Sequence, residues 1–409
     1  MNKIKIFNDP VYGFTSIPHG ILLDLVDHPY FQRLRRIKQV SLTHYVYPGA
    51  LHTRFHHALG ALHLMCQSID VLRSKDVDIS DEEAEGVKIA ILLHDIGHGP
   101  FSHTLEHTLI NVHHEEISLR FMERLNEVFG GKLDLAIRIF KDEYPKKFLH
   151  QLISGQLDMD RMDYLNRDSY FTGVSEGVIG FDRIIKMLAV HNGELVVEEK
   201  GVYSIEKFLI ARRLMYWQVY LHKTVLAAEQ MLLKTLQRAK ELAMAGEQLD
   251  VPRSLAFFLY QEISLEKFDA NLPEMLGHFA RLDDHDISYA LKTFADHPDP
   301  LLAYLAESIT SRRIFRIELK NSPFPLEYLE QVKKMVERRF GHFPSGYLDY
   351  LVMAGEQTNH AYNTAKDEIK ILYKDGSVVP ISQVMDFGLQ TNVSRKFYLC
   401  YPKVRDDKE

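Results

Sequence analysis

Apolar residues recur with the spacing of α-helices over most of the chain, from about residue 18 to residue 320. In each such segment they fall every three or four positions, so they share one helix face and can be buried together. One face of this kind is made by Phe55, Leu59, Leu62 and Cys66. The pattern predicts a large helical domain that covers residues 1–320.

A helix is predicted over residues 81–96, and both of its ends are marked in the sequence. Ser80 precedes it as an N-cap, and Glu83 stands three residues later, which is the spacing of a capping box. Glycine and proline residues after position 96 end the pattern. The helix therefore places His94 and Asp95 at the mouth of a buried segment.

Extended segments interrupt the helical pattern. The first 17 residues read as extended, and segments 194–198 and 201–205 flank Glu199-Lys200 as a predicted β-hairpin. After residue 320 we expect one helix over 326–340 and then short strands over 369–373, 377–381 and 396–401. The expected fold is mainly α, with a large helical core and a smaller α+β C-terminal region over residues 321–409.

Composition restricts the cellular location and the binding partners of the protein more than it restricts its function. The chain has 409 residues and only two cysteines, Cys66 and Cys400, which excludes a disulfide framework. The N-terminus lacks the apolar stretch of a secretory signal, and no apolar run approaches the ~20 residues that span a membrane. We therefore expect a cytoplasmic protein without membrane contact. The net charge of −7 argues against a dedicated nucleic-acid surface but not against a small anionic substrate.

The strongest chemical signal is the pair His94-Asp95, which directly follows an apolar run. An imidazole and a carboxylate at such a place need a partner, and a divalent metal suits both. Ten of the 21 histidines lie between His52 and His114, which favours a metal site over a chance pair. With His57 and Asp160 the chain offers a set of two histidines and two aspartates. This set does not choose among Mn, Fe, Zn and Ni, with Mg as an alternative or additional ion.

Two further helical faces carry polar side chains. One gathers Asp160, Asp163, Tyr164, Arg167 and Asp168 at intervals of three and four residues, and we favour an active-site role for it because Asp160 is needed as a ligand. The other mixes cations with phenols: Arg212, Tyr216, Tyr220 and Lys223. It is either an amphipathic surface with snorkelling ends or a phosphate clamp with an aromatic wall.

Several ordered blocks of the chain resemble the HD-domain phosphohydrolases, and within them the deoxynucleoside triphosphate triphosphohydrolases, which include dGTPases and SAM-and-HD-domain enzymes. The similarity covers roughly residues 5–320. Its blocks are Asn8-Asp9-Pro10 and the segments 31–39, 45–50, 52–57, 94–103, 114–115 and 159–168. Ordered blocks of this kind are far more specific than a single His-Asp pair.

The resemblance implies a role for each matching residue. The metal ligands would be His57, His94, Asp95 and Asp160. The residues facing the reacting phosphate would be His98, His103 and His114, with His103 as general acid. The groups gripping the triphosphate would be Arg54, Arg161, Arg212 and Lys223. Gln39 and Tyr164 would lie beside the deoxyribose, and Asp168 shares a helical face with Tyr164. Tyr216 and Tyr220 would lie near the base. The implied reaction is hydrolysis at the α-phosphorus to a deoxynucleoside and tripolyphosphate.

The resemblance also implies regulation, because such relatives are often oligomers activated by nucleotides. The positions that match residues reading a guanine nucleotide are Lys5, Asp27, Gln32 and Arg35, and those matching activator-phosphate groups are Arg312 and Arg316. A homo-oligomer, dimer or tetramer, and a guanine nucleotide activator are therefore expected. The opposing interpretation of these residues is an ordinary charged surface.

Two other functions stay open on the sequence alone. One is a different HD phosphohydrolase, acting on a nucleoside monophosphate, a cyclic nucleotide or an alarmone; it would share His94-Asp95 but not the long blocks over 31–39 and 45–57. The other is a non-catalytic nucleotide sensor, which a complete set of metal ligands disfavours. The chain departs from the family pattern at two positions. Tyr216 replaces a family histidine, and Leu221 stands where the family pattern has a polar residue that reads the base.

Overall fold

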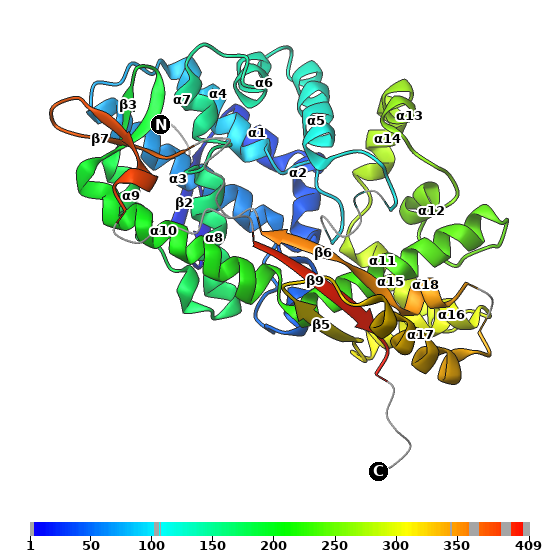
Figure 1. The fold of residues 1–409 in the computed structure, drawn as a ribbon. Helices are drawn as coiled ribbons and strands as arrows, with labels where there is room; N and C mark the ends of the chain where they lie inside the picture. Colours follow the sequence, from blue (N-terminus) through cyan, green and yellow to red (C-terminus); the bar gives the residue numbers. More distant parts are fainter. Residues whose placement is uncertain are drawn as a thin grey trace.

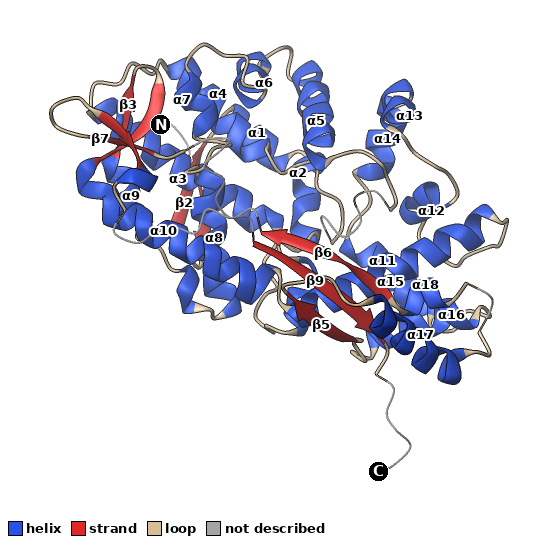
Figure 2. Ribbon diagram, viewed as in Figure 1, coloured by secondary structure: helices blue, strands red, loops and turns tan. Residues whose placement is uncertain are grey.

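The computed structural model describes residues 4–101, 106, 108–343, 346–359, 368–385 and 394–403. Figure 2 shows that helices make up most of the body and that strands lie toward its margins. The predicted fold class, a mainly α protein with a smaller sheet-containing C-terminal region, is confirmed. Within the described part of the chain, no helix has both the length and the apolar character that a bilayer crossing requires.

Helix α3 (Arg54–Ser74) lies at the centre of the core, and α4 (Asp81–Leu93) and α8 (Met159–Thr172) both pack against it. Most of its residues are therefore buried. The capping box predicted for α4 is present, because the Ser80 side chain accepts from Glu83 N–H and the Glu83 carboxylate accepts from Ser80 N–H. The ends of these three helices converge on one place, where the His-Asp residues lie.

The other helices surround this core (Figure 1). They are α1 (Ile21–Asp27), α2 (Pro29–Gln32), α5 (His114–Val128), α6 (Asp134–Phe140), α7 (Lys147–Gln151), α9 (Phe181–Met187), α10 (Val202–Met215), α11 (Lys223–Met244), α12 (Arg253–Leu259), α13 (Leu265–Ala270), α14 (Leu272–Phe279), α15 (Asp284–Phe294), α16 (Pro300–Thr310), α17 (Leu326–Phe340) and α18 (Leu348–Leu351). A π-helical turn, η6 (Tyr216–Tyr220), joins α10 to α11. Such turns are frequent at functional sites.

The strands form three sheets in the described residues. The N-terminal hairpin pairs β1 (Ile4–Asp9) with β2 (Gly13–Pro18). A second sheet has the order β3 (Leu188–His191), β4 (Glu194–Glu198), β7 (Lys370–Leu372) and β8 (Val378–Pro380). The third has the order β5 (Arg316–Lys320), β9 (Ser394–Tyr401) and β6 (Met353–Asn359).

Strand pairing crosses the predicted domain boundary at residue 320 in two places. Strand β4 of the helical region pairs in parallel with β7, where Val197 lies opposite Ile371. Strand β5 pairs with β9, where Ile317 lies opposite Cys400. Figure 1 accordingly shows the orange and red C-terminal strands at two separate places, beside β3 and beside β5. The C-terminal region is therefore attached to the helical body through both sheets.

The hairpin predicted near residue 200 is wrong in its second strand. Gly201 ends a 3-10 turn, residues 202–205 begin α10, and β4 instead pairs with the preceding strand β3. The turn between them is Asn192-Gly193, and both residues have positive φ, 51° and 81°. Two-residue hairpin turns require this conformation, which Asn-Gly adopts readily. The turn signal was therefore present in the sequence, seven residues before the predicted turn at Glu199-Lys200.

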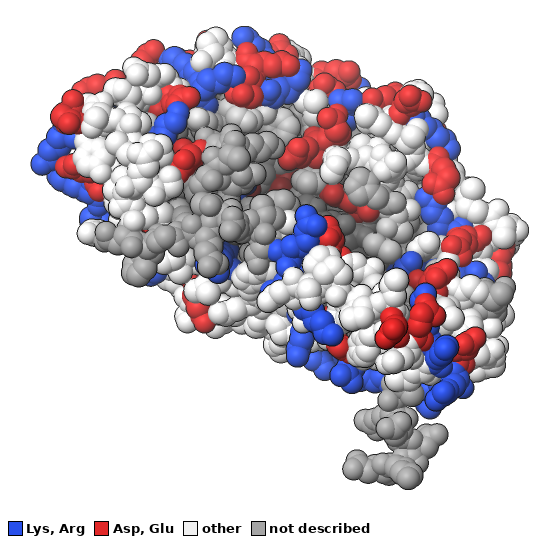
Figure 3. Space-filling model, in the orientation of Figure 1, with Lys and Arg blue, Asp and Glu red and all other residues white. Residues whose placement is uncertain are grey.

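Acidic and basic side chains are interspersed over the face shown in Figure 3.

One acid, Glu229 on α11, is half-buried beside the Ser41 hydroxyl. Burial raises the pKa of Glu229 to about 7, and the hydroxyl offsets only part of this. A carboxyl group whose pKa is higher in the folded than in the unfolded protein makes folding more favourable at low pH. This contribution is complete below the pKa of the unfolded state and is lost as the pH rises through the pKa of the folded state.

Replacing Glu229 by Gln should therefore stabilise the protein at alkaline but not at acidic pH. The gain is expected to be about 1–3 kcal/mol near pH 8 and close to zero near pH 4, because the variant no longer has to ionise a partly buried acid. Denaturant unfolding of both proteins across this range measures it. A gain that does not change with pH would show that Glu229 is not the titrating group.

Candidate active site

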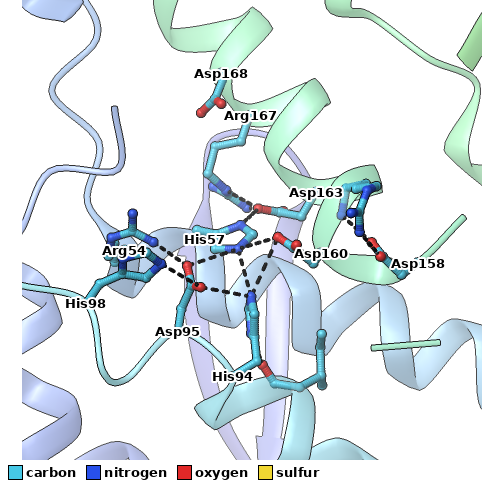
Figure 4. A network of polar contacts seen from close by, with 12 residues as sticks. Arg54, His57, His94, Asp95, His98, Asp158, Asp160, Asp163, Arg167 and Asp168 are labelled. Atoms are coloured by element: carbon cyan, nitrogen blue, oxygen red, sulfur yellow. Dashed lines mark hydrogen bonds and ion pairs between the residues drawn. The ribbon is translucent and has the colours of Figure 1, made fainter. Parts of the chain in front are cut away.

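Three helix ends bring the His-Asp residues together. His57 lies in the first turn of α3, where Thr53 and the His56 side chain form a capping box. His94 is the C-cap of α4. Asp160 lies in the first turn of α8, and its neighbour Asp158 is the N-cap that accepts from Arg161 N–H. Figure 4 shows the three side chains pointing toward one another from these helices.

The donor atoms of this cluster are separated by distances typical of ligands around one ion. The Nε2 atoms of His57 and His94 are 3.4 Å apart, and Asp160 Oδ1 lies 3.2 Å from the first and 3.6 Å from the second. Asp95 flanks them, with Oδ2 3.7 Å from His57 Nε2 and Oδ1 3.4 Å from His94 Nε2. The structure thus brings together all four residues that the sequence proposed as metal ligands.

Both imidazole rings are oriented from behind. His57 Nδ1 lies 2.7 Å from Asp163 Oδ2, and His94 Nδ1 lies 2.6 Å from the Ile91 carbonyl oxygen. Because each Nδ1 donates its proton there, each Nε2 presents a lone pair to the pocket. Two lone pairs and two carboxylates facing each other need a cation between them. The residues therefore fit a divalent metal, as HD domains bind one, and their types do not determine which.

The electrostatics of the cluster agree with this. Burial opposes charge on His57, but Asp160 and Asp163 outweigh it and raise the pKa of His57 to about 10. The pKa of His94 is raised as well, against burial, by Asp95 and Asp160. Burial also opposes the charge of Asp160, yet the two histidines hold its pKa below the ordinary range. The pocket thus favours positive charge: a proton on each ring when no cation is bound, or a metal ion that displaces these protons and binds the Nε2 lone pairs.

Asp95 also connects the cluster to Arg54 and to the loop that follows α4. Arg54 donates from Nη1 to Asp95 Oδ2, and His98 Nε2 lies 3.2 Å from Asp95 Oδ1. Burial and then the charge of Arg54 hold the pKa of His98 well below its usual value. The loop that carries His98 is held by buried Arg33, which donates to the carbonyl oxygens of Ile96 and His98.

A second histidine pair lies next to this loop. The rings of His98 and His114 stack at 3.9 Å, and His114 Nδ1 pairs with Glu106. The three side chains bring one ligand atom each within 4.8 Å of the others. His103, predicted to be the general acid, lies outside the described residues.

The residues predicted to bind the sugar and base gather at η6 and α8. Tyr220 donates to Asp168 Oδ2 at 2.7 Å, and its ring lies edge-on to Tyr164 and to Tyr216. Asp168 Oδ1 also lies 2.6 Å from His52 Nε2, so this carboxylate is already engaged by two protein groups. The buried amide oxygen of Gln39, by contrast, has no hydrogen-bond partner among the residues that the structure describes.

The residues predicted to grip phosphates are placed unequally. Arg161 is held by the Asp158 carboxylate, and Arg212 donates from Nη1 to Gln156 Oε1 at 3.0 Å. Burial lowers the pKa of Arg212. Lys223 lies exposed at the start of α11. Arg161 lies near enough for its charge to lower the pKa of Arg212 further.

The residues predicted to bind an activator lie on two parts of the surface. Gln32 accepts from Arg35 Nε at 2.9 Å, and Asp27 is close enough to raise the pKa of Arg35, which burial lowers overall. Lys5 is exposed on β1. Arg312 donates to the Tyr45 carbonyl oxygen, and Arg316 lies exposed on β5.

Some residues of the site received no role from the sequence. These are His52, Asp158 and Arg33, which contact other residues of the site. Asp163 was placed on the face expected to serve the active site, but its contact with His57 was not predicted. For Asp163 a signal existed, because Arg167 stands four residues later and the two can pair on one helix face. For Arg33 no local pattern distinguishes it from the neighbouring arginines, since its partners lie more than 60 residues away.

This cluster of histidines and aspartates at converging helix ends defines an HD domain. Residues 54–168 match the HD domain, and residues 179–251 match the HD associated region. The chain belongs to the HD-domain phosphohydrolase family.

Individual relatives extend this likeness to the whole chain. A crystal structure of a phosphohydrolase from Bacteroides thetaiotaomicron has 52% sequence identity and a TM-score of 0.94, over 98% of this chain and 100% of that one. The uncharacterized protein YwfO of Bacillus subtilis is 31% identical over 98% of this chain and 93% of its own length. The SAMHD1 homolog of Dictyostelium discoideum, a deoxynucleoside triphosphate triphosphohydrolase, is 31% identical over 61% of this chain. The chain spans about half the length of that enzyme, 52%.

Proposed function

We propose that the chain is a metal-dependent deoxynucleoside triphosphate triphosphohydrolase, which releases a deoxynucleoside and tripolyphosphate. The observation that carries the proposal is that the donor cluster adjoins both buried arginines and a tyrosine. Arg54 contacts Asp95 directly, and Tyr164 lies one helical turn beyond Asp160. Relatives named as deoxynucleoside triphosphate triphosphohydrolases support the choice of substrate.

His57, His94, Asp95 and Asp160 would hold the metal. A divalent ion bound there supplies Lewis-acid polarisation of a phosphoryl oxygen. The cations Arg54, Arg161, Arg212 and Lys223 neutralise and orient the triphosphate, because guanidinium and ammonium groups bind phosphate through charge-assisted hydrogen bonds. Holding the α-phosphorus against the cluster makes attack by water effectively intramolecular.

Proton transfer is assigned to histidines. Water forms a bond to the α-phosphorus, the bond from that phosphorus to the sugar 5′-oxygen breaks, and His103 donates a proton to the leaving oxygen. The proton that the attacking water releases restores the protonated form of His103 through solvent, so the reaction balances. His98 and His114 face the reacting phosphate, and Glu106 orients His114. His98 is held in its neutral form by burial and by Arg54, so it can accept a hydrogen bond from water.

Gln39 and Tyr164 supply the preference for deoxyribose. Both side chains lie in a crowded, largely buried surrounding, and a ribose 2′-hydroxyl would need room and a partner there. The tyrosines of η6 provide flat apolar surfaces that accept any base. This arrangement accounts for discrimination by sugar and predicts weaker discrimination by base.

The proposal includes a homo-oligomer, dimer or tetramer, that a guanine nucleotide activates. Its binding residues would be Lys5, Asp27, Gln32 and Arg35, with Arg312 and Arg316 as further phosphate groups. The contact between Gln32 and Arg35 supports one nucleotide-reading patch. A nucleotide that binds the assembled form better must shift the population toward it.

The direct test offers each dNTP and NTP with Mn²⁺ or Mg²⁺, with and without GTP, and separates the nucleoside products. Deoxynucleotides should be hydrolysed to deoxynucleosides at kcat/KM values at least about 10²-fold above those of ribonucleotides, as steric exclusion of one hydroxyl allows. Equal values for dGTP and GTP would contradict the assignment. Rate and sedimentation that ignore added GTP would remove the regulatory part alone.

A further inference from the structure

A continuous line of buried charged side chains runs from the N-terminal hairpin to the metal ligand His57. Asp9 Oδ2 lies 2.9 Å from Arg167 Nη1. Arg167 donates from Nε and Nη2 to the two carboxylate oxygens of Asp163, both at 2.9 Å. Asp163 Oδ2 then accepts from His57 Nδ1 at 2.7 Å. Figure 4 shows Arg167, Asp163 and His57 in contact one after another, with His57 reaching the donor cluster.

These groups are shielded from water, so each depends on the next. Arg167, Asp163 and His57 are completely buried, and Asp9 is 7% exposed. A buried guanidinium is stable only when carboxylates compensate it, and the loss of one partner leaves uncompensated charge. Asp9 takes a share of the Arg167 charge, which leaves Asp163 more of its own negative charge for the His57 N–H. The pull of Asp163 on His57 therefore depends on Asp9.

The backbone of α3 is shaped to admit this line of charges. A Cβ atom at Gly60 would lie 2.0 Å from Asp163 Oδ1 and 2.1 Å from Arg167 Nη2. Glycine is therefore required in the middle of α3, although it is a weak helix former. Gly60 stands one turn after His57, so the same helix supplies both the ligand and the space for the groups that orient it.

Asp9 has a second role at the tip of the hairpin. Its Oδ1 accepts from the backbone N–H groups of Val11 and Tyr12 at 2.8 and 3.0 Å, and this organises the turn between β1 and β2. The Tyr12 ring lies 5.5 Å from the Arg167 guanidinium carbon. One carboxylate thus shapes the turn with one oxygen and holds Arg167 with the other.

We propose that Asp9 is a positioning residue for the metal site, acting on His57 through Arg167 and Asp163. Docking of the N-terminal hairpin and affinity for the metal are then thermodynamically linked: each strengthens the other by the same factor. This requires only the metal cluster and not the proposed substrate. It gives the hairpin a function beyond the exposed Lys5 that it carries.

The variant Asp9→Asn tests the link with little disturbance, because the amide oxygen can keep the turn while the ion pair to Arg167 is lost. Asp24→Asn is the matched control, since Asp24 is an exposed acid on α1, shortly after the hairpin. Mn²⁺ affinity is measured by chelator competition without nucleotide. We expect Asp9→Asn to weaken it by about 10-fold, within the range for groups that orient metal ligands, and Asp24→Asn to leave it unchanged.

Hydrogen exchange supplies a second, independent readout on the intact protein. Removing Mn²⁺ from the wild type should speed exchange in the hairpin, residues 4–18, more than in α17, and Asp9→Asn should abolish this difference. If Asp9→Asn loosens the hairpin while Mn²⁺ affinity stays at the wild-type value, Asp9 is structural only and the proposal is overturned. Because no nucleotide is present, this outcome is independent of whether dNTPs are substrates.

Discussion

Replacing Asp160 by Ala is expected to remove bound metal and hydrolytic activity together. The carboxylate contacts both ligand imidazoles, at 3.2 and 3.6 Å, and without it the two Nε2 atoms have lost a shared anionic partner. Metal assistance contributes several kcal/mol to such reactions, so hydrolysis should fall by at least about 10³-fold. Elemental analysis and dNTP turnover on the same preparation measure both effects.

Asp70→Ala is the control for this variant. Asp70 is an exposed acid on α3, the helix that carries His57, and lies well beyond the cluster along it. It should keep full metal content and rate. Full metal occupancy in Asp160→Ala would show that Asp160 is not a ligand, whatever happened to the rate.

Replacing Gly97 by Ala is expected to disrupt the loop after His94-Asp95 and to destabilise the whole helical core. A Cβ atom at Gly97 would lie 2.2 Å from the His114 carbonyl oxygen and 2.3 Å from Ser118 N. The Ser118 hydroxyl accepts from Gly97 N–H and donates to the His94 carbonyl oxygen, so moving α5 away breaks both bonds. The cost should be about 3–5 kcal/mol, from overpacking together with two lost hydrogen bonds.

Gly99→Ala separates this effect from any general intolerance of the loop. Its Cβ would meet ring carbons of Phe279 at 3.6 and 3.7 Å, which is ordinary contact. It should change the unfolding free energy by less than about 1 kcal/mol. Denaturant unfolding compares the two variants, and equal stability would contradict the close approach of α5 to Gly97.

The features that the sequence predicted well are those with a local signal. The helix after Ser80 has its cap, its periodicity and its glycine stop within 20 residues of one another, and the structure places it over Asp81–Leu93. The helix over 326–340 matches α17 because its apolar face is equally regular. The grouping of His57, His94, Asp95 and Asp160 was accessible because a carboxylate and an imidazole at a helix end have few other uses, and their role as metal ligands stays a prediction.

The features that it missed depend on contacts between distant segments. Nothing near Asp9 indicates that its carboxylate will meet Arg167, and the parallel pairing of β4 with β7 joins residues more than 170 positions apart. The pairing of β5 with β9 across residue 320 has no local signal for the same reason. The misplaced hairpin is different, because Asn192-Gly193 was a local signal that the prediction passed over.

The cluster that contains His57 and Asp160 is proposed to hydrolyse dNTPs at the α-phosphorus. The fate of the oxygen atom from water tests this directly. The protein is incubated with a dNTP in water labelled with heavy oxygen, and the phosphate products are identified by phosphorus NMR. We predict tripolyphosphate that carries the label at one end, together with unlabelled deoxynucleoside. Pyrophosphate with a deoxynucleoside monophosphate, or orthophosphate with a diphosphate, would contradict the account.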